Sequence, residues 1–341
     1  MISSHLSTFG YRHQILCGRG TTALWLAVRS IVCQYPDQPV EIVIPDLLCS
    51  TILDGILLAG AVPRFAAVSV DRYTVTPTTI AAAITTNTRA ILVAHLFGHV
   101  VDIPAIRVAA PHLPIIEDAV QGLGGVNVGT AGDLSFLSFD PTKMIGGHGG
   151  VLMLNDDSLA DLVRADLLTL EPDWSAVRRA LSVVLDPAAA KGYELQLRLL
   201  ARNLLRTFDN TPANVNGILA DWQTLPLRVT QRNEKALWLQ ESLSDLSLTR
   251  PAIYPTDSIW RYTFAAQSSH AARRIAHALA RSGVLATKLY TPLSRLLGQN
   301  AATADLASKL INLWVDDSVD NSYLQRAIQV IRSHNNPANS C

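Results

Sequence analysis

Short, nearly continuous apolar runs alternate with helix-like stretches through the first half of the chain. The expected strands are residues 41–45, 63–70, 90–97, 114–117, 134–139 and 151–154. The expected helices between them are residues 22–32, 50–60, 78–84 and 102–109. Continuously apolar strands are typical of a sheet covered on both faces, and their alternation with helices predicts a largely parallel α/β arrangement.

The pattern changes after residue 155, where helical segments rich in Leu, Ala and Arg follow one another. Helices are expected over residues 158–170, 174–185, 193–208, 228–246, 271–282 and 322–333, and strands over 259–267 and 284–289. We therefore predict a large α/β domain at residues 1–225, with a mostly parallel sheet covered by helices. A smaller α+β domain is expected at residues 226–341.

Composition narrows the classes of function. The 341 residues are 49% hydrophobic and 16% charged, which excludes intrinsic disorder. Lys+Arg and Asp+Glu both number 28, so no net basic charge attracts nucleic acid or an anionic membrane. No run reaches the ~20 apolar residues of a membrane span, and the first residues lack the apolar core of a secretory signal. Four cysteines without a CxxC pair form no disulfide framework, so we expect a cytoplasmic protein.

The first segment with candidate chemistry is residues 17–28, CGRGTTALWLAV. Two glycines and two threonines run directly into an amphipathic helix. Backbone N–H groups at a helix start, together with the helix dipole, favour an anion such as phosphate. The same residues also make an ordinary helix start without a ligand, and this alternative stays open.

The second segment is residues 114–125, PIIEDAVQGLGG. A buried strand ends in Glu117 and Asp118, and Gln121 follows three residues later. Ligands of α/β proteins bind at the carboxyl ends of parallel strands. A carboxylate buried there needs a positive partner. Asp118 is therefore a candidate ligand contact, or alternatively the N-cap of a following helix.

The third segment is residues 132–150, GDLSFLSFDPTKMIGGHGG. Lys143 stands between a strand that carries Ser135 and Ser138 and a loop that contains four glycines. Lysine is scarce in this chain, with 5 lysines against 23 arginines. A lysine beside hydroxyls and bare backbone indicates a ligand site, because a buried lysine amine loses its proton readily and attacks carbonyl groups.

Together the three segments contain the groups that pyridoxal phosphate requires. Its phosphate needs N–H donors and hydroxyls, its ring nitrogen a carboxylate, and its aldehyde a lysine amine. The order and spacing resemble the DegT-type aminotransferase family of fold type I pyridoxal-phosphate enzymes, known for nucleotide-sugar aminotransferases. The matching blocks are RGTTALWLAV, IPDLLCSTILDGILLAGAVPRF, AILVAHLFG, IEDAVQGLGG, VGTAGDLSFLSFDPTK and GGHGG.

The resemblance implies a role for each matching residue. Lys143 binds the cofactor covalently, and Asp118 pairs with the ring nitrogen. The remaining cofactor contacts are Gly20, Thr21 and Ser138 at the phosphate, Gln121 near the ring hydroxyl, Cys49 on the ring face, and His95 at a strand end. His95 is alternatively a core histidine. His95 and His99 are spaced like metal ligands but lack a third, so no metal site is expected.

Two departures from the family pattern affect the cofactor site. Cys49 occupies the position of an aromatic residue that family members stack on the cofactor. The segment with which the neighbouring subunit reaches the phosphate reads RTFDNTPANVNG, so Thr207 or Asn210 has to substitute there. Because the family shares its sites between subunits and the chain carries little charge, we expect a homodimer.

The resemblance implies an aminotransferase. It moves an amino group from a small-molecule donor to a keto acceptor in a biosynthetic pathway, and the usual acceptor of the family is a keto sugar on a nucleotide. Elimination or decarboxylation with the same cofactor stays open. A second class is a dinucleotide-binding oxidoreductase, with residues 18–20 as the dinucleotide loop and Asp46 as the ribose acid. This alternative leaves Lys143 and Asp118 without a role.

Overall fold

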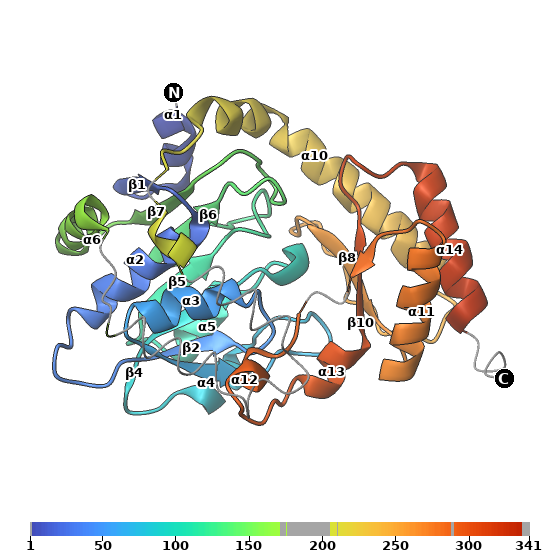
Figure 1. The fold of residues 1–341 in the computed structure, drawn as a ribbon, viewed down its shortest axis with the longest axis horizontal. Helices are drawn as coiled ribbons and strands as arrows, with labels where there is room; N and C mark the ends of the chain where they lie inside the picture. The colour runs from blue at the N-terminus through green and yellow to red at the C-terminus, as the bar shows by residue number, and fades with distance from the viewer. Residues whose placement is uncertain (1, 171–174, 176–204, 210, 288–289, 336–341) are drawn as a thin grey trace.

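Two β-sheets organise the chain (Figure 1). The computed structural model describes residues 2–170, 175, 205–209, 211–287 and 290–335. The helix expected at residues 174–185 and most of the one expected at 193–208 lie outside the described residues.

The larger sheet has seven strands. They are β1 (His13–Cys17), β2 (Glu41–Pro45), β3 (Val62–Ala66), β4 (Thr88–Ala94), β5 (Ile115–Asp118), β6 (Leu134–Ser138) and β7 (Gly150–Leu154). Their order is β1–β7–β6–β5–β4–β2–β3. The five strands from β6 to β3 are parallel, while β7 and β1 each run antiparallel to their inner neighbour. The mostly parallel α/β sheet is thus confirmed.

Helices cover both faces of this sheet. They are α1 (Ile2–Leu6), α2 (Gly20–Val32), α3 (Thr51–Leu58), α4 (Pro77–Ala83), α5 (Ile103–Ala109) and α6 (Asp157–Thr169). Polar side chains fix several of the starts, since Asp102 accepts a 3.0 Å hydrogen bond from the Ala105 amide and Asp156 a 2.9 Å bond from the Leu159 amide.

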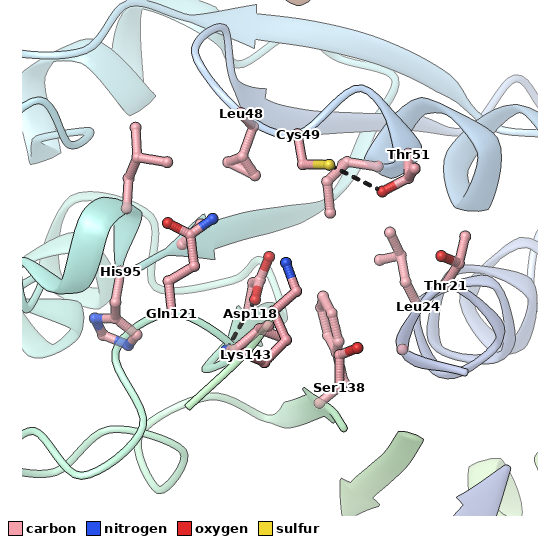
Figure 2. A pocket seen from close by; sticks show the side chains of 16 residues that line it. Thr21, Leu24, Leu48, Cys49, Thr51, His95, Asp118, Gln121, Ser138 and Lys143 are labelled. Atoms are coloured by element: carbon pink, nitrogen blue, oxygen red, sulfur yellow. Dashed lines mark hydrogen bonds between the residues drawn. The ribbon is translucent and has the colours of Figure 1, made fainter. Parts of the chain in front are cut away.

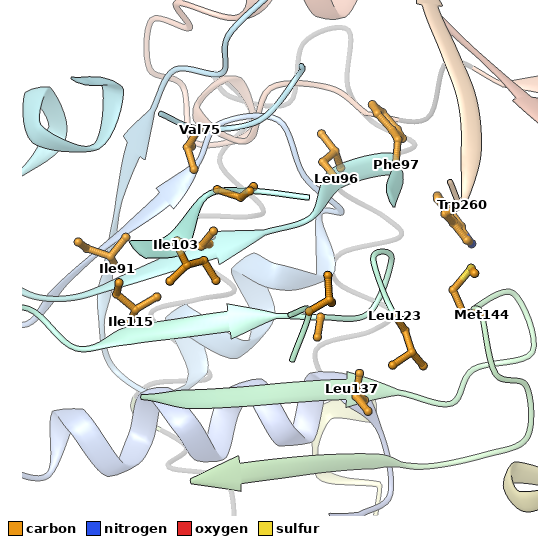
Figure 3. Close-up of a cluster of buried hydrophobic side chains, with 14 of the residues drawn as sticks. Val75, Ile91, Leu96, Phe97, Ile103, Ile115, Leu123, Leu137, Met144 and Trp260 are labelled. Atoms are coloured by element: carbon orange, nitrogen blue, oxygen red, sulfur yellow. The ribbon is translucent and has the colours of Figure 1, made fainter. Parts of the chain in front are cut away.

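The alternation of side chains along β4 explains the continuous apolar run in its sequence. Ala90 and Leu92 belong to the hydrophobic core on one face, whereas Ile91 and Val93 belong to the core on the other, and none of the four is exposed. Figure 3 shows the second core, in which Ile91 and neighbouring strand residues are drawn with Trp260 at the margin. Two covered faces therefore leave no solvent-facing side for polar residues.

The smaller sheet is antiparallel and has the order β8–β10–β9. The strands of this sheet are β8 (Arg261–Ala265), β9 (Ala286–Thr287) and β10 (Leu310–Trp314). The helices in this part of the chain are α10 (Val215–Ser242), α11 (Ser269–Arg281), α12 (Leu293–Leu296), α13 (Ala304–Lys309) and α14 (Asn321–Asn335). In Figure 1, α10 runs from the larger sheet across to the smaller one.

The boundary expected near residue 225 falls inside α10, next to Pro226. The helix begins at Val215 rather than at residue 228, so one continuous element passes through the expected division. The division into two domains stays a prediction. Among the helices described, none combines the length and the apolar character that crossing a membrane requires.

Candidate active site

A pocket lies at the carboxyl ends of β4, β5 and β6, beside the start of α2 (Figure 2). It is lined by all eight of the predicted site residues, namely Gly20, Thr21, Cys49, His95, Asp118, Gln121, Ser138 and Lys143. Much of the remaining wall is apolar and consists of Leu24, Leu48, Ile52, Ala94, Leu96, Val120 and Phe136. The fold thus brings five segments that are separate in the sequence into one cavity.

Asp118 ends β5 and presents a buried carboxylate to the pocket. The backbone amide of Val120 donates a 3.0 Å hydrogen bond to Oδ1, the one hydrogen bond to this side chain among the described residues. Burial raises the pKa of Asp118 to about 6, against the opposing effects of the Val120 amide and the Lys143 charge. No helix follows, so Asp118 is not the N-cap of one. A positive ligand group in the pocket would stabilise its charged form.

Lys143 lies in the loop after β6, and its side chain points into the same pocket (Figure 2). Its Nζ lies 5.2 Å from the centroid of the Trp260 ring. The loop is held by the Asp140 carboxylate, which accepts from the backbone and hydroxyl of Thr142. The Trp260 indole donates a 2.9 Å hydrogen bond to the Thr142 carbonyl. Lys143 therefore projects from a fixed turn.

The start of α2 and the end of β6 approach each other closely at the pocket edge. A Cβ on Gly20 would overlap Ser138, so only glycine permits this contact. Arg19, at the N-cap, makes no side-chain capping hydrogen bond. The first amides of the helix, with the hydroxyls of Thr21 and Ser138, are thus arranged around a space suited to an anion.

His95 occupies the margin of the pocket, and its polar atoms are bonded elsewhere. Nδ1 accepts a 3.0 Å hydrogen bond from the Val101 amide, so Nε2 carries the proton and donates to Glu117 Oε1 at 3.0 Å. Burial alone raises the pKa of Glu117, but His95 and backbone amides donate to its carboxylate and lower the net value. His95 is a hydrogen-bonded core histidine that presents ring atoms, not a free nitrogen, to the pocket.

His99 contacts a different carboxylate. Its Nδ1 lies 3.6 Å from Asp257, so His95 and His99 do not converge. Within the described residues, no group of three His, Cys, Asp or Glu side chains could hold a metal ion.

Gln121 is fixed at both ends of its amide. Oε1 accepts a 2.8 Å hydrogen bond from the Phe97 backbone, and Nε2 donates to the Tyr290 hydroxyl at 2.9 Å. The Tyr290 ring stacks on Phe97 with 5.5 Å between the centroids. The contact of Tyr290 with Gln121 was not anticipated from the sequence.

Cys49 lines the pocket from the loop before α3 (Figure 2). Its Sγ lies 3.2 Å from Thr51 Oγ1. No aromatic side chain stands at this position, so a small sulfur group occupies the place expected for a stacking ring.

The segment expected to reach a neighbouring subunit packs against its own chain. Thr207 is fully buried, and its carbonyl accepts a 2.6 Å hydrogen bond from Thr22 Oγ1 in α2. The next residue, Phe208, meets the edge of Trp25 at 5.3 Å. Thr207 is thus held within its own chain, and its contact with a neighbouring subunit stays a prediction. Asn210 lies outside the described residues.

The dinucleotide alternative does not fit the position of Asp46. Its carboxylate accepts hydrogen bonds from the Ser294 amide at 2.9 Å and the Thr303 hydroxyl at 2.5 Å. Asp46 is only 2% exposed, so no carboxylate oxygen is left for a ribose.

Comparison with known proteins gives a match over nearly the whole chain. The model of the DegT/DnrJ/EryC1/StrS aminotransferase family matches residues 6–326. A UDP-N-acetyl-3-dehydro-alpha-D-glucosamine 3-aminotransferase of Acidithiobacillus ferrooxidans is 36% identical over 163 residues, which cover 46% of this chain and 43% of that protein. A GDP-perosamine synthase of Caulobacter vibrioides is 34% identical over 162 residues, with 46% and 43% covered. The matched segments span less than half of each relative.

Solved structures match over a greater length. The sugar aminotransferase CalS13 of Micromonospora echinospora superimposes with a TM-score of 0.74 at 18% identity, covering 97% of this chain and 90% of that one. The PseC aminotransferase of Helicobacter pylori gives a TM-score of 0.75 at 17% identity, covering 97% and 89%. These likenesses confirm the expected fold type I architecture.

Proposed function

Because the chain belongs to the DegT/DnrJ/EryC1/StrS aminotransferase family, we propose that it binds pyridoxal phosphate in the pocket and transfers an amino group. The donor is a small amino compound and the acceptor a small keto compound. One observation carries the proposal: Lys143 and the buried carboxylate of Asp118 line the same cavity beside the start of α2.

The residues present fit this cofactor. Asp118 is buried with a single hydrogen-bond donor, so it has an oxygen available for a protonated ring nitrogen. The hydroxyls of Thr21 and Ser138 border the space at the helix start, where a phosphate is favoured. Lys143 supplies the amine that an aldehyde requires. These donors and acceptors match the three polar ends of pyridoxal phosphate.

Each side chain has a distinct task in the reaction. When bound, pyridoxal phosphate supplies an electron-withdrawing ring that stabilises negative charge on a substrate carbon. Asp118 holds a proton on the ring nitrogen, which strengthens that withdrawal. The Lys143 amine takes a proton from the α-carbon of the amino donor, and a base positioned in this way contributes roughly 10²–10⁴-fold to the rate. The apolar side chains Val120 and Phe136 limit the access of water.

We take a keto sugar carried on a nucleotide as the acceptor. The names of the relatives support this choice, since they specify UDP- and GDP-linked sugars. We place the protein in the cytoplasm as a homodimer. Three free cysteines among the described residues and the zero net charge support this assignment.

Borohydride reduction tests the covalent role of Lys143. The protein incubated with pyridoxal phosphate is expected to show a visible absorption band that reduction bleaches, with the pyridoxyl group mapped to Lys143 by mass spectrometry. Lys143→Ala abolishes this adduct. Lys309→Ala, which removes a partly exposed lysine paired with Asp305, serves as the control and keeps the adduct on Lys143. A wild-type yield of adduct on another lysine in Lys143→Ala would overturn the proposal.

A further inference from the structure

A stretch of this chain lies directly against the start of α2. The 3-10 helix η3 (Leu205–Phe208) is joined to α2 by the hydrogen bond from Thr22 to the Thr207 carbonyl. A Cβ on Gly18 would overlap the carbonyl oxygen of Asp209, so the lack of a side chain at Gly18 permits the contact. Further along, the Asn214 amide donates a 2.9 Å hydrogen bond to the carbonyl of His148.

These contacts hold Arg206 beside the proposed phosphate site. A second cavity adjoins the pocket and shares Thr21, Ser138 and Lys143 with it. Arg206 lines this second cavity, although it is more than 50 residues away in sequence from the other lining residues. The Asp209 amide donates a 3.1 Å hydrogen bond to the Arg206 carbonyl, which closes the turn that carries the arginine.

The second cavity has a surplus of positive charge. Its lining includes Arg19, Arg206 and Lys143, against a single carboxylate, that of Asp140. Arg19 lies 3.8 Å from Asp140, and the exposed Arg206 forms no ion pair with any described residue. The buried Nε2 of His148 has no hydrogen-bond partner among the described residues. An arrangement of this kind favours a doubly charged phosphate over a neutral ligand.

We propose that Arg206 binds the cofactor phosphate within its own chain, with Arg19 and His148 beside it. The inference rests on the proposed function. The sequence predicted that Thr207 or Asn210 of a neighbouring subunit contacts the phosphate. The proposal assigns this contact to Arg206, in η3 of the same chain. The arginine at the phosphate then comes from the same chain that supplies Thr21, Ser138 and Lys143.

The first experiment compares ligands with and without the phosphate group. Dissociation constants for pyridoxal phosphate and for pyridoxal are measured by absorbance in the wild type, Arg206→Gln and Arg206→Lys. Arg206→Gln is expected to weaken pyridoxal phosphate binding by about 10- to 100-fold, the range of a charge-assisted hydrogen bond, and to leave pyridoxal unchanged. Arg206→Lys restores part of the affinity. Arg273→Gln, at an exposed arginine on α11, is the matched control.

An equal loss of affinity for both ligands, or no loss for either, would overturn the inference. Inorganic phosphate provides a test that does not depend on the cofactor. It is expected to raise the melting temperature of the wild type and of Arg273→Gln but not that of Arg206→Gln. If the wild type responds to phosphate but binds no pyridoxal phosphate, the proposed function is contradicted and the anion site is retained. If the wild type and Arg206→Gln bind pyridoxal phosphate with the same affinity, the anion site alone is contradicted.

Subunit mixing tests whether the contact stays within one chain. Lys143→Ala and Arg206→Gln chains are combined, exchanged and reduced with borohydride at a pyridoxal phosphate concentration that saturates only the wild type. Only the Arg206→Gln chain has Lys143, so labelling reports its phosphate affinity. If Arg206 acts in its own chain, the Arg206→Gln chain is expected to stay poorly labelled in the mixture. Labelling restored by the partner chain would show that Arg206 acts across subunits and would overturn the inference.

Discussion

Glu117 and Asp118 are adjacent in β5, yet their surroundings shift their pKa values in opposite directions. Successive strand residues point to opposite faces, so Glu117 meets His95 and the amides of Gly129, Ala131 and Gly132, whereas Asp118 faces the pocket. Hydrogen bonds lower the pKa of Glu117 despite its burial, while burial raises that of Asp118. The Glu117 carboxylate is therefore used in hydrogen bonds within the protein, whereas the Asp118 carboxylate is available to a ligand.

The raised pKa of Asp118 predicts a pH-dependent stability without cofactor. In the folded chain its pKa is about 6, above the unfolded value, so folding favours the neutral acid. Its contribution is fully present below pH 4 and is lost as the pH rises through 6, by roughly 3 kcal/mol for a shift of about two units. Asp118→Asn removes this loss. Denaturant unfolding of the two proteins from pH 4 to 8 measures the difference.

Glu117→Gln is the control for the Asp118 prediction, because its sign is reversed. The pKa of Glu117 is lowered in the folded chain, so its contribution is present above the unfolded value and declines as the pH falls. Glu117→Gln therefore destabilises the protein near neutral pH. An Asp118→Asn protein that follows the wild-type pH profile would contradict the assigned environment.

At the scale of elements, the close approach of η3 to the start of α2 depends on Gly18. Gly18→Ala places a methyl group on the Asp209 carbonyl, and we expect a loss of about 1–3 kcal/mol in the free energy of unfolding. Displacement of η3 also weakens pyridoxal phosphate binding and spares pyridoxal. Thermal denaturation and the two dissociation constants measure these effects.

Gly283→Ala separates steric overlap from backbone strain. Gly283 has a φ of +71° and open space around a Cβ, so alanine there costs about 1–2 kcal/mol through the backbone alone. It lies between α11 and β9, away from the pocket, and leaves cofactor affinity unchanged. If Gly18→Ala matched Gly283→Ala in stability and in phosphate affinity, packing of η3 on Gly18 would have no bearing on the site.

The sequence predicted strands with continuous apolar runs, such as β4 and β7, and it missed two strands that contain polar residues. β1 (His13–Cys17) lies at the sheet edge and begins with two polar residues, His13 and Gln14. β10 (Leu310–Trp314) has Asn312 at its centre, where the side chain is buried and donates to Thr263 at 2.8 Å. A hydrogen bond formed across the sheet is not visible in an apolar pattern.

The candidate site likewise contains residues that the sequence predicted and residues that it did not. Lys143 and Asp118 stand in motifs that the chain carries locally, so their convergence could be anticipated from parallel strands that end at one edge. Trp260, Tyr290 and Arg206 reach the site from regions without such motifs. The early start of α10 was also missed: the helix was expected from residue 228, whereas it begins at Val215 and continues through Pro226, a residue that usually interrupts helices.

At the scale of the whole molecule, the zero net charge removes a long-range barrier to association of two copies. We expect sedimentation equilibrium to give twice the chain mass at micromolar concentration. Dilution to the monomer is expected to preserve the preference for pyridoxal phosphate over pyridoxal, because Arg206 acts in its own chain. A chain that stays monomeric at every concentration and retains full activity would exclude the dimer.

The antiparallel pairing of β1 with β7 has a consequence for biosynthesis. His13 pairs with Leu154 and Cys17 with Gly150, so the strand that leads into α2 finds its one neighbour among the described strands more than 130 residues later. At about 5–20 residues per second, the ribosome needs on the order of 10–30 s to synthesise that stretch. During this time the start of α2 has no β7 beside it. The nascent chain is therefore expected to acquire its cofactor only after the seventh strand has emerged.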